Sequence, residues 1–311
     1  MKYLTGLLVL LLILVNITLI FFHFTSLEQR YTNTHQLAGL IVTNNIIDET
    51  IPTSHIKSAK KVLKKIEEEK KPTIALPEKS KIAIVLDDLG VETFKSYLLD
   101  RIKTKINLAI IPGMQDSKKL VQKYAKDNRF ELIMHLPMEP MNSKDMESKD
   151  GKGYRYKYLI TTDMDEQTIT EQLTEALDSL DRTGVIKGMN NHMGSKATRS
   201  RITMKSVMPW LKNNNLYFLD SRTISTTVGY ETAKELQVPA LYNEIFLDGQ
   251  DDELYVTKQL AKAKNLAKKN GFVIAIGHIQ RESTIVVLFR ELPKLQNEGY
   301  ELVFLSELIE D

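Results

Sequence analysis

Acidic and imidazole side chains stand directly after short apolar runs in this sequence. Asp87 and Asp88 follow the run 82–86, and His278 comes two residues after the run 272–276. Three of the six histidines lie beyond residue 80, and each ends such a run: His135, His192 and His278. Because the carboxyl ends of parallel strands meet at one edge of a sheet, strands at these runs would gather the acidic and imidazole groups together.

Carboxylates and neutral imidazoles in one pocket are typical ligands of Zn²⁺ or a similar divalent ion. Two histidines and one carboxylate leave a position open for water, as catalytic zinc sites do. The metal lowers the pKa of that water toward about 7 and polarises a carbonyl group. A second carboxylate can then take a proton from the water, and a further histidine can protonate a leaving amine. The set predicts metal-assisted hydrolysis of an amide or ester, a chemistry that several unrelated metallohydrolases share.

Glu139 is a further carboxylate near this set, four positions after His135. Pro137 and Pro140 argue against a helix there, so the helical zinc motif with ligands four residues apart does not apply. Glu139 is therefore either a ligand or substrate contact, or the acceptor of a structural hydrogen bond.

Asparagines and a charged pair also stand at the ends of apolar runs. Two asparagines immediately precede His192. Asp220 follows the run 216–219, and Arg222 comes two positions later. These two residues either contact substrate or form only a buried ion pair that fixes the rim of the site. We assign a substrate-contacting or supporting role to five residues: Glu139, Asn190, Asn191, Asp220 and Arg222.

Composition excludes several other classes of protein. The chain has 311 residues, of which 26% are charged and 42% hydrophobic, as in ordinary globular proteins. It contains no cysteine, which excludes disulfides, thiolate nucleophiles and iron–sulfur ligation. The formal net charge of +2 argues against general nucleic-acid binding, which needs a strongly basic face. No phosphate-binding loop, complete dinucleotide fingerprint or serine-hydrolase elbow is present.

Short apolar runs alternate with amphipathic segments from residue 81 onward, which predicts repeated βα units and a parallel sheet. Helices are expected at about 163–180, 251–270 and 284–297. The number of units favours a closed or nearly closed (β/α) barrel of about seven strands, with an open doubly wound sheet as the alternative. The expected strands are 82–86, 106–111, 131–134, 186–189, 216–219, 240–242, 272–276 and 302–305.

The amino-terminal part of the chain differs from the rest. Residues 4–24 are almost entirely apolar and carry no formal charge, and the run is long enough to cross a bilayer. It ends in bulky residues, which favours an uncleaved anchor over a cleaved signal peptide. Lys2 places the amino terminus in the cytoplasm. We predict an anchor at 1–25, a linker at 26–79 and a domain at 80–311, in the periplasm or extracytoplasmic space beyond the cytoplasmic membrane.

Five motifs, in order, resemble the divergent polysaccharide deacetylase family, a branch of the NodB-type carbohydrate esterases. They lie at 86–90, 135–140, 190–195, 220–223 and 276–278, and the resemblance runs from about residue 81 to 310. It implies a distorted (β/α) barrel with a metal near the carboxyl ends of the strands. It also implies that Asp87 is the catalytic base and Asp88 a metal ligand. His135 would then be a second ligand, and His278 would protonate the leaving group.

The sequence departs from the NodB pattern at two places. The family's second histidine, four residues after the first, is Glu139 here, and its arginine–proline motif is replaced by 190–195. We therefore predict His192 as the third ligand, with Glu139 as the alternative.

These observations predict a zinc-dependent deacetylase that acts on an N-acetylated, peptidoglycan-like envelope glycan. A non-catalytic envelope protein that uses the same barrel to bind a glycan or a partner is the first alternative. A metal hydrolase of other amides or esters is the second.

Overall fold

The structure of the chain is a computed structural model that describes residues 79–90, 96–146 and 156–309. These ranges belong to one compact unit. The predicted anchor and all of the predicted linker except Lys79 lie outside the described residues. Within the described ranges, no helix is both long and apolar enough to cross a membrane.

Parallel strands form one sheet in the described part of the chain. In chain order they are β1 (Lys81–Leu89), β2 (Ile106–Ile110), β3 (Phe130–Met138), β4 (Ile186–Met193), β5 (Tyr217–Asp220), β6 (Ala240–Tyr242), β7 (Ile245–Phe246), β8 (Phe272–His278) and β9 (Glu301–Leu302). Their order across the sheet is β6-β5-β4-β3-β2-β1-β8-β7, and β9 also pairs with β1.

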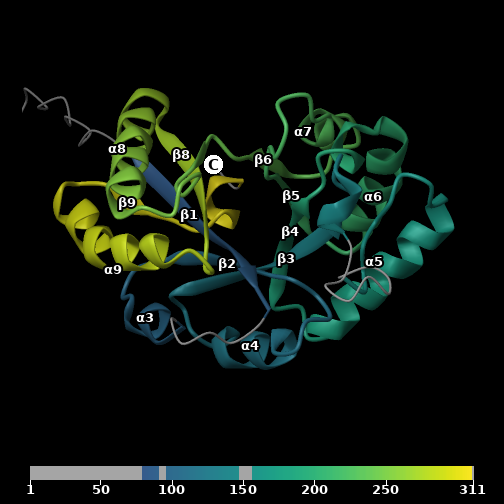
Figure 1. Ribbon diagram of the computed structural model, residues 1–311, viewed down its shortest axis with the longest axis horizontal. Coiled ribbons are helices and arrows are strands. Elements are labelled where there is room, and N and C mark those ends of the chain that lie inside the picture. The colour runs from purple at the N-terminus through teal and green to yellow at the C-terminus, as the bar shows by residue number, and fades with distance from the viewer. Residues whose placement is uncertain (1–78, 91–95, 147–155, 310–311) are drawn as a thin grey trace, which may run out of the picture. The chain divides into compact units, whose positions relative to one another are not determined.

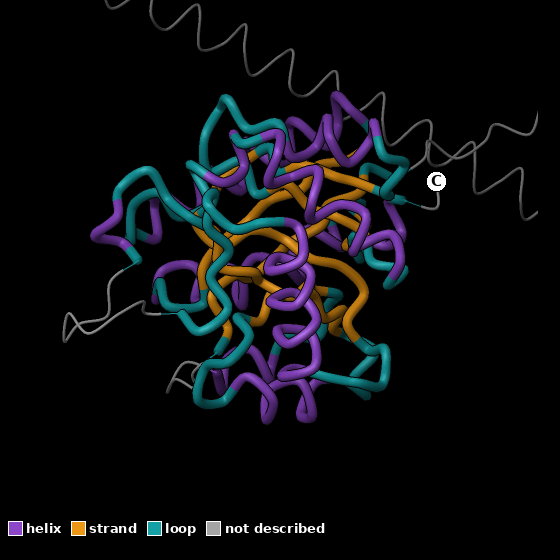
Figure 2. Tube along the Cα trace, turned by 90° about the vertical axis from the view of Figure 1, so that its right-hand side faces the viewer, coloured by secondary structure: helices purple, strands orange, loops and turns teal. Residues whose placement is uncertain are grey.

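Helices surround the sheet on its outer side (Figures 1 and 2). They are α3 (Ser96–Arg101), α4 (Ser117–Tyr124), α5 (Glu166–Leu180), α6 (Arg201–Asn213), α7 (Gly229–Glu235), α8 (Glu253–Asn270) and α9 (Glu282–Asn297). Most of them connect one parallel strand to the next, as crossover helices do. The expected helices at about 163–180, 251–270 and 284–297 correspond to α5, α8 and α9.

The sheet curls so that its two edge strands come together. β6 and β7 stand at opposite ends of the strand order, yet only Asn243 and Glu244 separate them along the chain. The amide of Asn243 donates to the carbonyl of Asp220, and the amide of Glu244 donates to the carbonyl of Ile274. Among the described strands, no ladder of hydrogen bonds joins β6 to β7. Only the two-residue connection bridges the gap between these edge strands. The predicted barrel is therefore a curled, all-parallel sheet that is not closed by hydrogen bonds.

Each strand contributes to two cores because its alternate residues face opposite sides of the sheet. In β1, Ile82, Ile84 and Leu86 belong to the large cluster that the outer helices cover. The smaller residues Ala83 and Val85 belong to a second cluster inside the curl. Burial on both faces explains why the strands are nearly continuous apolar runs in the sequence.

The chain after β9 packs into the inner core at the edge of the sheet where the strands begin. Leu305 is fully buried there, and its amide donates to Oδ1 of Asn107 at 2.9 Å. Nδ2 of Asn107 donates to the carbonyl of Ile84, also at 2.9 Å. The sequence predicted a strand over 302–305, but of these residues only Leu302 belongs to a strand. The chain then bends inward, and Val303 and Leu305 pack inside the curled sheet.

We expect Asn107→Ala to lower the free energy of unfolding by about 3 kcal/mol. The substitution leaves a buried carbonyl and a buried N–H without partners, and each costs about 1–3 kcal/mol. Denaturant unfolding followed by circular dichroism measures the change. The control is Asn213→Ala at the exposed end of α6. A loss for Asn107→Ala no larger than that of the control would show that Asn107 does not hold the inner core together.

Candidate metal centre

Two consecutive carboxylates at the end of β1 reach the same imidazole. Neighbouring residues of a regular strand face opposite sides of the sheet. Here the pairing of β1 with β2 shifts register between Leu86 and Leu89, and Asp88 has a φ of +66°. Aspartate tolerates this left-handed backbone better than most residues. The irregularity lets Asp87 and Asp88 approach Nε2 of His135 to 3.6 and 3.2 Å.

Asp88, His135 and His192 come from three different strands and meet at one point. Asp88 Oδ1 lies 3.2 Å from His135 Nε2 and 2.9 Å from His192 Nδ1, and the two ring nitrogens are 3.1 Å apart. In a flat sheet β1 and β4 would be about 14 Å apart, because two strands separate them and neighbours are about 4.8 Å apart. The curl of the sheet therefore brings His192 to Asp88.

The spacing of these three atoms fits a divalent ion. Ligand atoms about 2.1 Å from an ion, at angles of about 90–110°, lie about 3.0–3.4 Å from one another. The observed separations fall close to the short end of that range. Oδ1 of Asp88 is buried and has no hydrogen-bond partner in the described part of the chain apart from these ring nitrogens. Three converging lone pairs repel unless a cation or a proton lies between them.

Asn190 determines which nitrogen of His135 faces Asp88. Oδ1 of Asn190 accepts from Nδ1 of His135 at 2.7 Å. Its Nδ2 donates to Asp87 Oδ1 at 2.9 Å and to Ser221 Oγ at 3.2 Å, which fixes the orientation of the amide. A neutral His135 therefore carries its lone pair on Nε2. Histidines that bind metals typically donate their other ring N–H in this way.

Burial and neighbouring charges move the pKa values of these groups in different directions. Burial raises the pKa of Asp87 above its ordinary value, although positive charge on His135 acts against this. Burial also acts to raise the pKa of Asp88, but in the metal-free protein protons on the ring nitrogens of His135 and His192 that face it lower that pKa overall. Burial lowers the pKa of His192, which favours a neutral imidazole, and its Nδ1 lone pair becomes available when the ring proton is on Nε2.

His278 ends β8 directly beside Asp87, its register partner on β1. Asp248 accepts from the main-chain amide of His278 at 2.6 Å and lies 2.9 Å from its Nδ1. Burial acts to lower the pKa of His278, but the hydrogen bond with Asp248 and the charge of Asp87 outweigh it and raise the pKa to about 9. His278 is therefore protonated at neutral pH in the metal-free protein.

Asp248 is a site residue that the sequence analysis missed. The strand before it, β7, has only two residues, too few to stand out as an apolar run. The signal was nevertheless present, because Asp248 follows Ile245, Phe246 and Leu247 just as Asp87 follows the apolar run of β1.

An open cavity of about 540 Å³ adjoins the site. Its lining residues are Asp88, Phe246, Asp248, Gly249, Asp251, His278, Gln280 and Arg281. The ring of Phe246 is stacked on that of His278, with centroids 6.1 Å apart and an angle of 13° between the planes. The cavity gives a substrate access to Asp88 and His278 at the same time.

Comparison with known proteins identifies the family. The family model described as divergent polysaccharide deacetylase matches residues 84–309. The chain belongs to the divergent polysaccharide deacetylase family. This confirms the resemblance found in the sequence motifs.

The chain is also similar to individual proteins and to solved structures. A Haemophilus influenzae protein is 35% identical over 229 residues, which cover 74% of this chain and 76% of that protein. YibQ of Escherichia coli is 32% identical over 198 residues, which cover 64% of this chain but only 58% of YibQ. A crystal structure of an Agrobacterium tumefaciens protein matches with a TM-score of 0.66 at 18% identity, over 74% of this chain and 89% of that one, which shows the fold alone.

In this member of the family, His192 and not Glu139 lies beside Asp88 and His135. Glu139 instead forms an ion pair with Lys196 Nζ at 2.6 Å. It also accepts from the amide and the hydroxyl of Thr162, at 2.7 and 2.6 Å. Glu139 thus makes structural hydrogen bonds at the carboxyl end of β3.

The other predicted residues shape the rim of the site. Asn191 accepts from the amide of Ser221 at 2.9 Å. Asp220 is fully buried and accepts from the main-chain amides of Arg222 and of Tyr230 in α7. The guanidinium of Arg222 lies over the ring of Tyr242, 3.7 Å from its centroid. A buried side-chain pair between Asp220 and Arg222 therefore does not form, because the arginine is exposed and stacks on the tyrosine.

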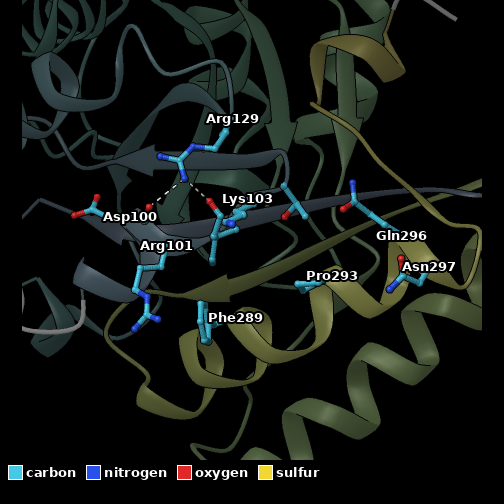
Figure 3. A pocket seen from close by; sticks show the side chains of 10 residues that line it. Asp100, Arg101, Lys103, Arg129, Phe289, Pro293, Gln296 and Asn297 are labelled. Atoms are coloured by element: carbon cyan, nitrogen blue, oxygen red, sulfur yellow. Dashed lines mark hydrogen bonds between the residues drawn. The ribbon is translucent and has the colours of Figure 1, made fainter.

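A larger cavity of about 740 Å³ lies at the opposite edge of the sheet (Figure 3). Arg129, which directly precedes β3, lines it and donates to the carbonyls of Asp100 and Ile102. Thr104, two residues before β2, lines it as well. None of the three converging residues contributes to this cavity, which is therefore separate from the candidate site.

We expect nuclear magnetic resonance of the metal-free chain to show His278 titrating well above its ordinary value of about 6.5, near pH 9. Asp248→Asn should lower that pKa by at least one unit, because it removes the negative partner. Because the pKa of His278 is raised and that of Asp248 is lowered, the pair stabilises the fold fully between about pH 4 and about pH 6.5. This stabilisation is lost as the pH rises through about 9 and again as the pH falls through the lowered pKa of Asp248. An unchanged pKa in Asp248→Asn would contradict the assigned role of Asp248.

Proposed function

We propose that the protein is a metal-dependent hydrolase that removes acetyl groups from an N-acetylated envelope polysaccharide. The observation that supports this most is the meeting of Asp88 Oδ1, His135 Nε2 and His192 Nδ1 within 3.2 Å of one another. Asp87 and His278 stand beside this triad with raised pKa values, as a general base and a general acid require.

The proposed roles follow from where each group lies. Asp88, His135 and His192 would hold a divalent ion, with zinc as the expected ion, and the bound ion would supply polarisation of the acetyl carbonyl and a more acidic water. Asp87 takes a proton from the water as its oxygen attacks the carbonyl carbon. His278 gives its proton to the amide nitrogen as the C–N bond breaks, which releases acetate and a free amine. Asp248 holds the ring of His278 in place and stabilises its charge.

The proposal includes the class of substrate and the location of the protein in the cell. Membership of the family supports an acetylated polysaccharide, and the open cavity beside Asp88 and His278 gives a sugar chain access to both groups. The apolar run at 4–24 supports a single membrane anchor, with the catalytic domain outside the cytoplasm and close to the peptidoglycan.

We expect the full-length protein, purified without added metal, to contain about one divalent ion per chain and to release acetate from chitooligosaccharides or peptidoglycan fragments. His135→Ala and His192→Ala should lose both the ion and the activity. Asp87→Asn should keep the ion but lower acetate release at least about 100-fold, because general base catalysis contributes about 10²–10⁴. Metal analysis and an acetate assay measure the two quantities.

Two controls accompany these variants. Asp163→Asn changes an exposed carboxylate and should leave both quantities unchanged. Glu139→Gln removes the alternative ligand and should keep the ion. A protein without a bound ion, in which Asp87→Asn has no effect, would contradict the hydrolase and favour non-catalytic glycan binding. A bound ion with activity only on other amides or esters would contradict the polysaccharide substrate.

A further inference from the structure

Tyr156 contacts the side of His192 that faces away from Asp88. Its hydroxyl lies 2.9 Å from Nε2 of His192, and the two rings pack edge to face with centroids 4.8 Å apart. Tyr156 comes from the connection between β3 and α5, outside every motif that identified the site in the sequence. The contact matters because the opposite ring nitrogen, Nδ1, is the atom that meets Asp88 and His135.

A neutral imidazole carries one proton and one ring lone pair, so the two nitrogens cannot both bind a metal. If Nδ1 of His192 is the ligand atom, its proton must be on Nε2. In that tautomer the Nε2–H points to the hydroxyl oxygen of Tyr156, which can accept it. His135 has the reverse arrangement, since Asn190 holds its Nδ1 proton and Nε2 is free to bind.

The ring of Tyr156 is held by packing that does not involve His192. Tyr156 is only 5% exposed and belongs to a small cluster with Ile111, Met146 and Leu159. These residues come from segments that follow β2 and β3, so several elements fix the position of the hydroxyl. An acceptor that is fixed in advance costs little entropy when the ligand binds.

We propose that Tyr156 is a positioning residue of the metal site. Its hydroxyl holds His192 in the Nε2–H tautomer and so directs the Nδ1 lone pair toward Asp88 Oδ1 and His135 Nε2. This inference rests on the proposed metal-dependent function. It assigns to a neutral hydroxyl the task that a carboxylate or a carbonyl performs beside most metal-binding histidines.

The test compares Tyr156→Phe with Tyr158→Phe in the full-length chain. Both substitutions remove one hydroxyl and keep the ring. Tyr158 is as buried as Tyr156, but its hydroxyl bonds to Lys157 Nζ at 3.0 Å. Zinc affinity is measured by competition with a chromophoric chelator. We expect Tyr156→Phe to weaken binding at least about 10-fold, as loss of such a partner does at other metal sites, and Tyr158→Phe to leave it unchanged.

A second readout follows the tautomer itself. In the zinc-loaded wild type with ¹⁵N-labelled histidine, we expect His192 to carry its proton on Nε2, with slow exchange of that proton with water. In Tyr156→Phe the same proton should exchange faster, because its acceptor is gone.

The outcomes separate the two proposals. Equal zinc affinity in the wild type and Tyr156→Phe would overturn the role of Tyr156 while leaving the metal site intact. An equal loss in Tyr158→Phe would also overturn it, because the effect would then be general. A wild type that binds no zinc would overturn the proposed function, and the role of Tyr156 with it.

Discussion

The structure depends on one electrostatic constraint. Asp88 Oδ1, His135 Nε2 and His192 Nδ1 lie about 3 Å from one another and are shielded from solvent. Their lone pairs repel one another unless a positive charge lies between them. The surrounding residues hold this arrangement nonetheless. Asp88 adopts a left-handed backbone, and a fully buried Asn190 links His135, Asp87 and Ser221. Strained backbone and buried polar networks of this kind are typical of functional sites.

The curl of the sheet is the feature of the fold that makes this convergence geometrically feasible. Asp88 and His192 end strands that two others separate, and only curvature brings them within 2.9 Å. The inner core fills the space that the curl encloses, because strand residues that range from Ala83 to Tyr217 pack there together with Val303 and Leu305 of the chain after β9. Asn107 ties that segment to β1 and β2 at the edge of the sheet opposite to the three converging side chains.

Much of the fold and part of the site could be predicted from the sequence, for a physical reason. Parallel strands buried on both faces are short apolar runs, and the residues at the end of each run lie at one edge of the sheet, which located Asp88, His135 and His192. Two features were beyond this rule. Asp248 comes after a strand of two residues, and Tyr156 lies in a connection with no periodic pattern. The sequence favoured His192 over Glu139 as the third ligand, but the approach of His192 to Asp88 depends on curvature, which no local pattern encodes.

The central claim is that the three side chains form one cation site. The most direct measurement is a crystal structure of the protein grown with zinc, with anomalous scattering recorded at the zinc edge. The claim predicts a single strong anomalous peak about 2.0–2.2 Å from Asp88 Oδ1, His135 Nε2 and His192 Nδ1. No peak there, with the three groups still at hydrogen-bonding distances, would contradict it, as would a zinc ion bound elsewhere.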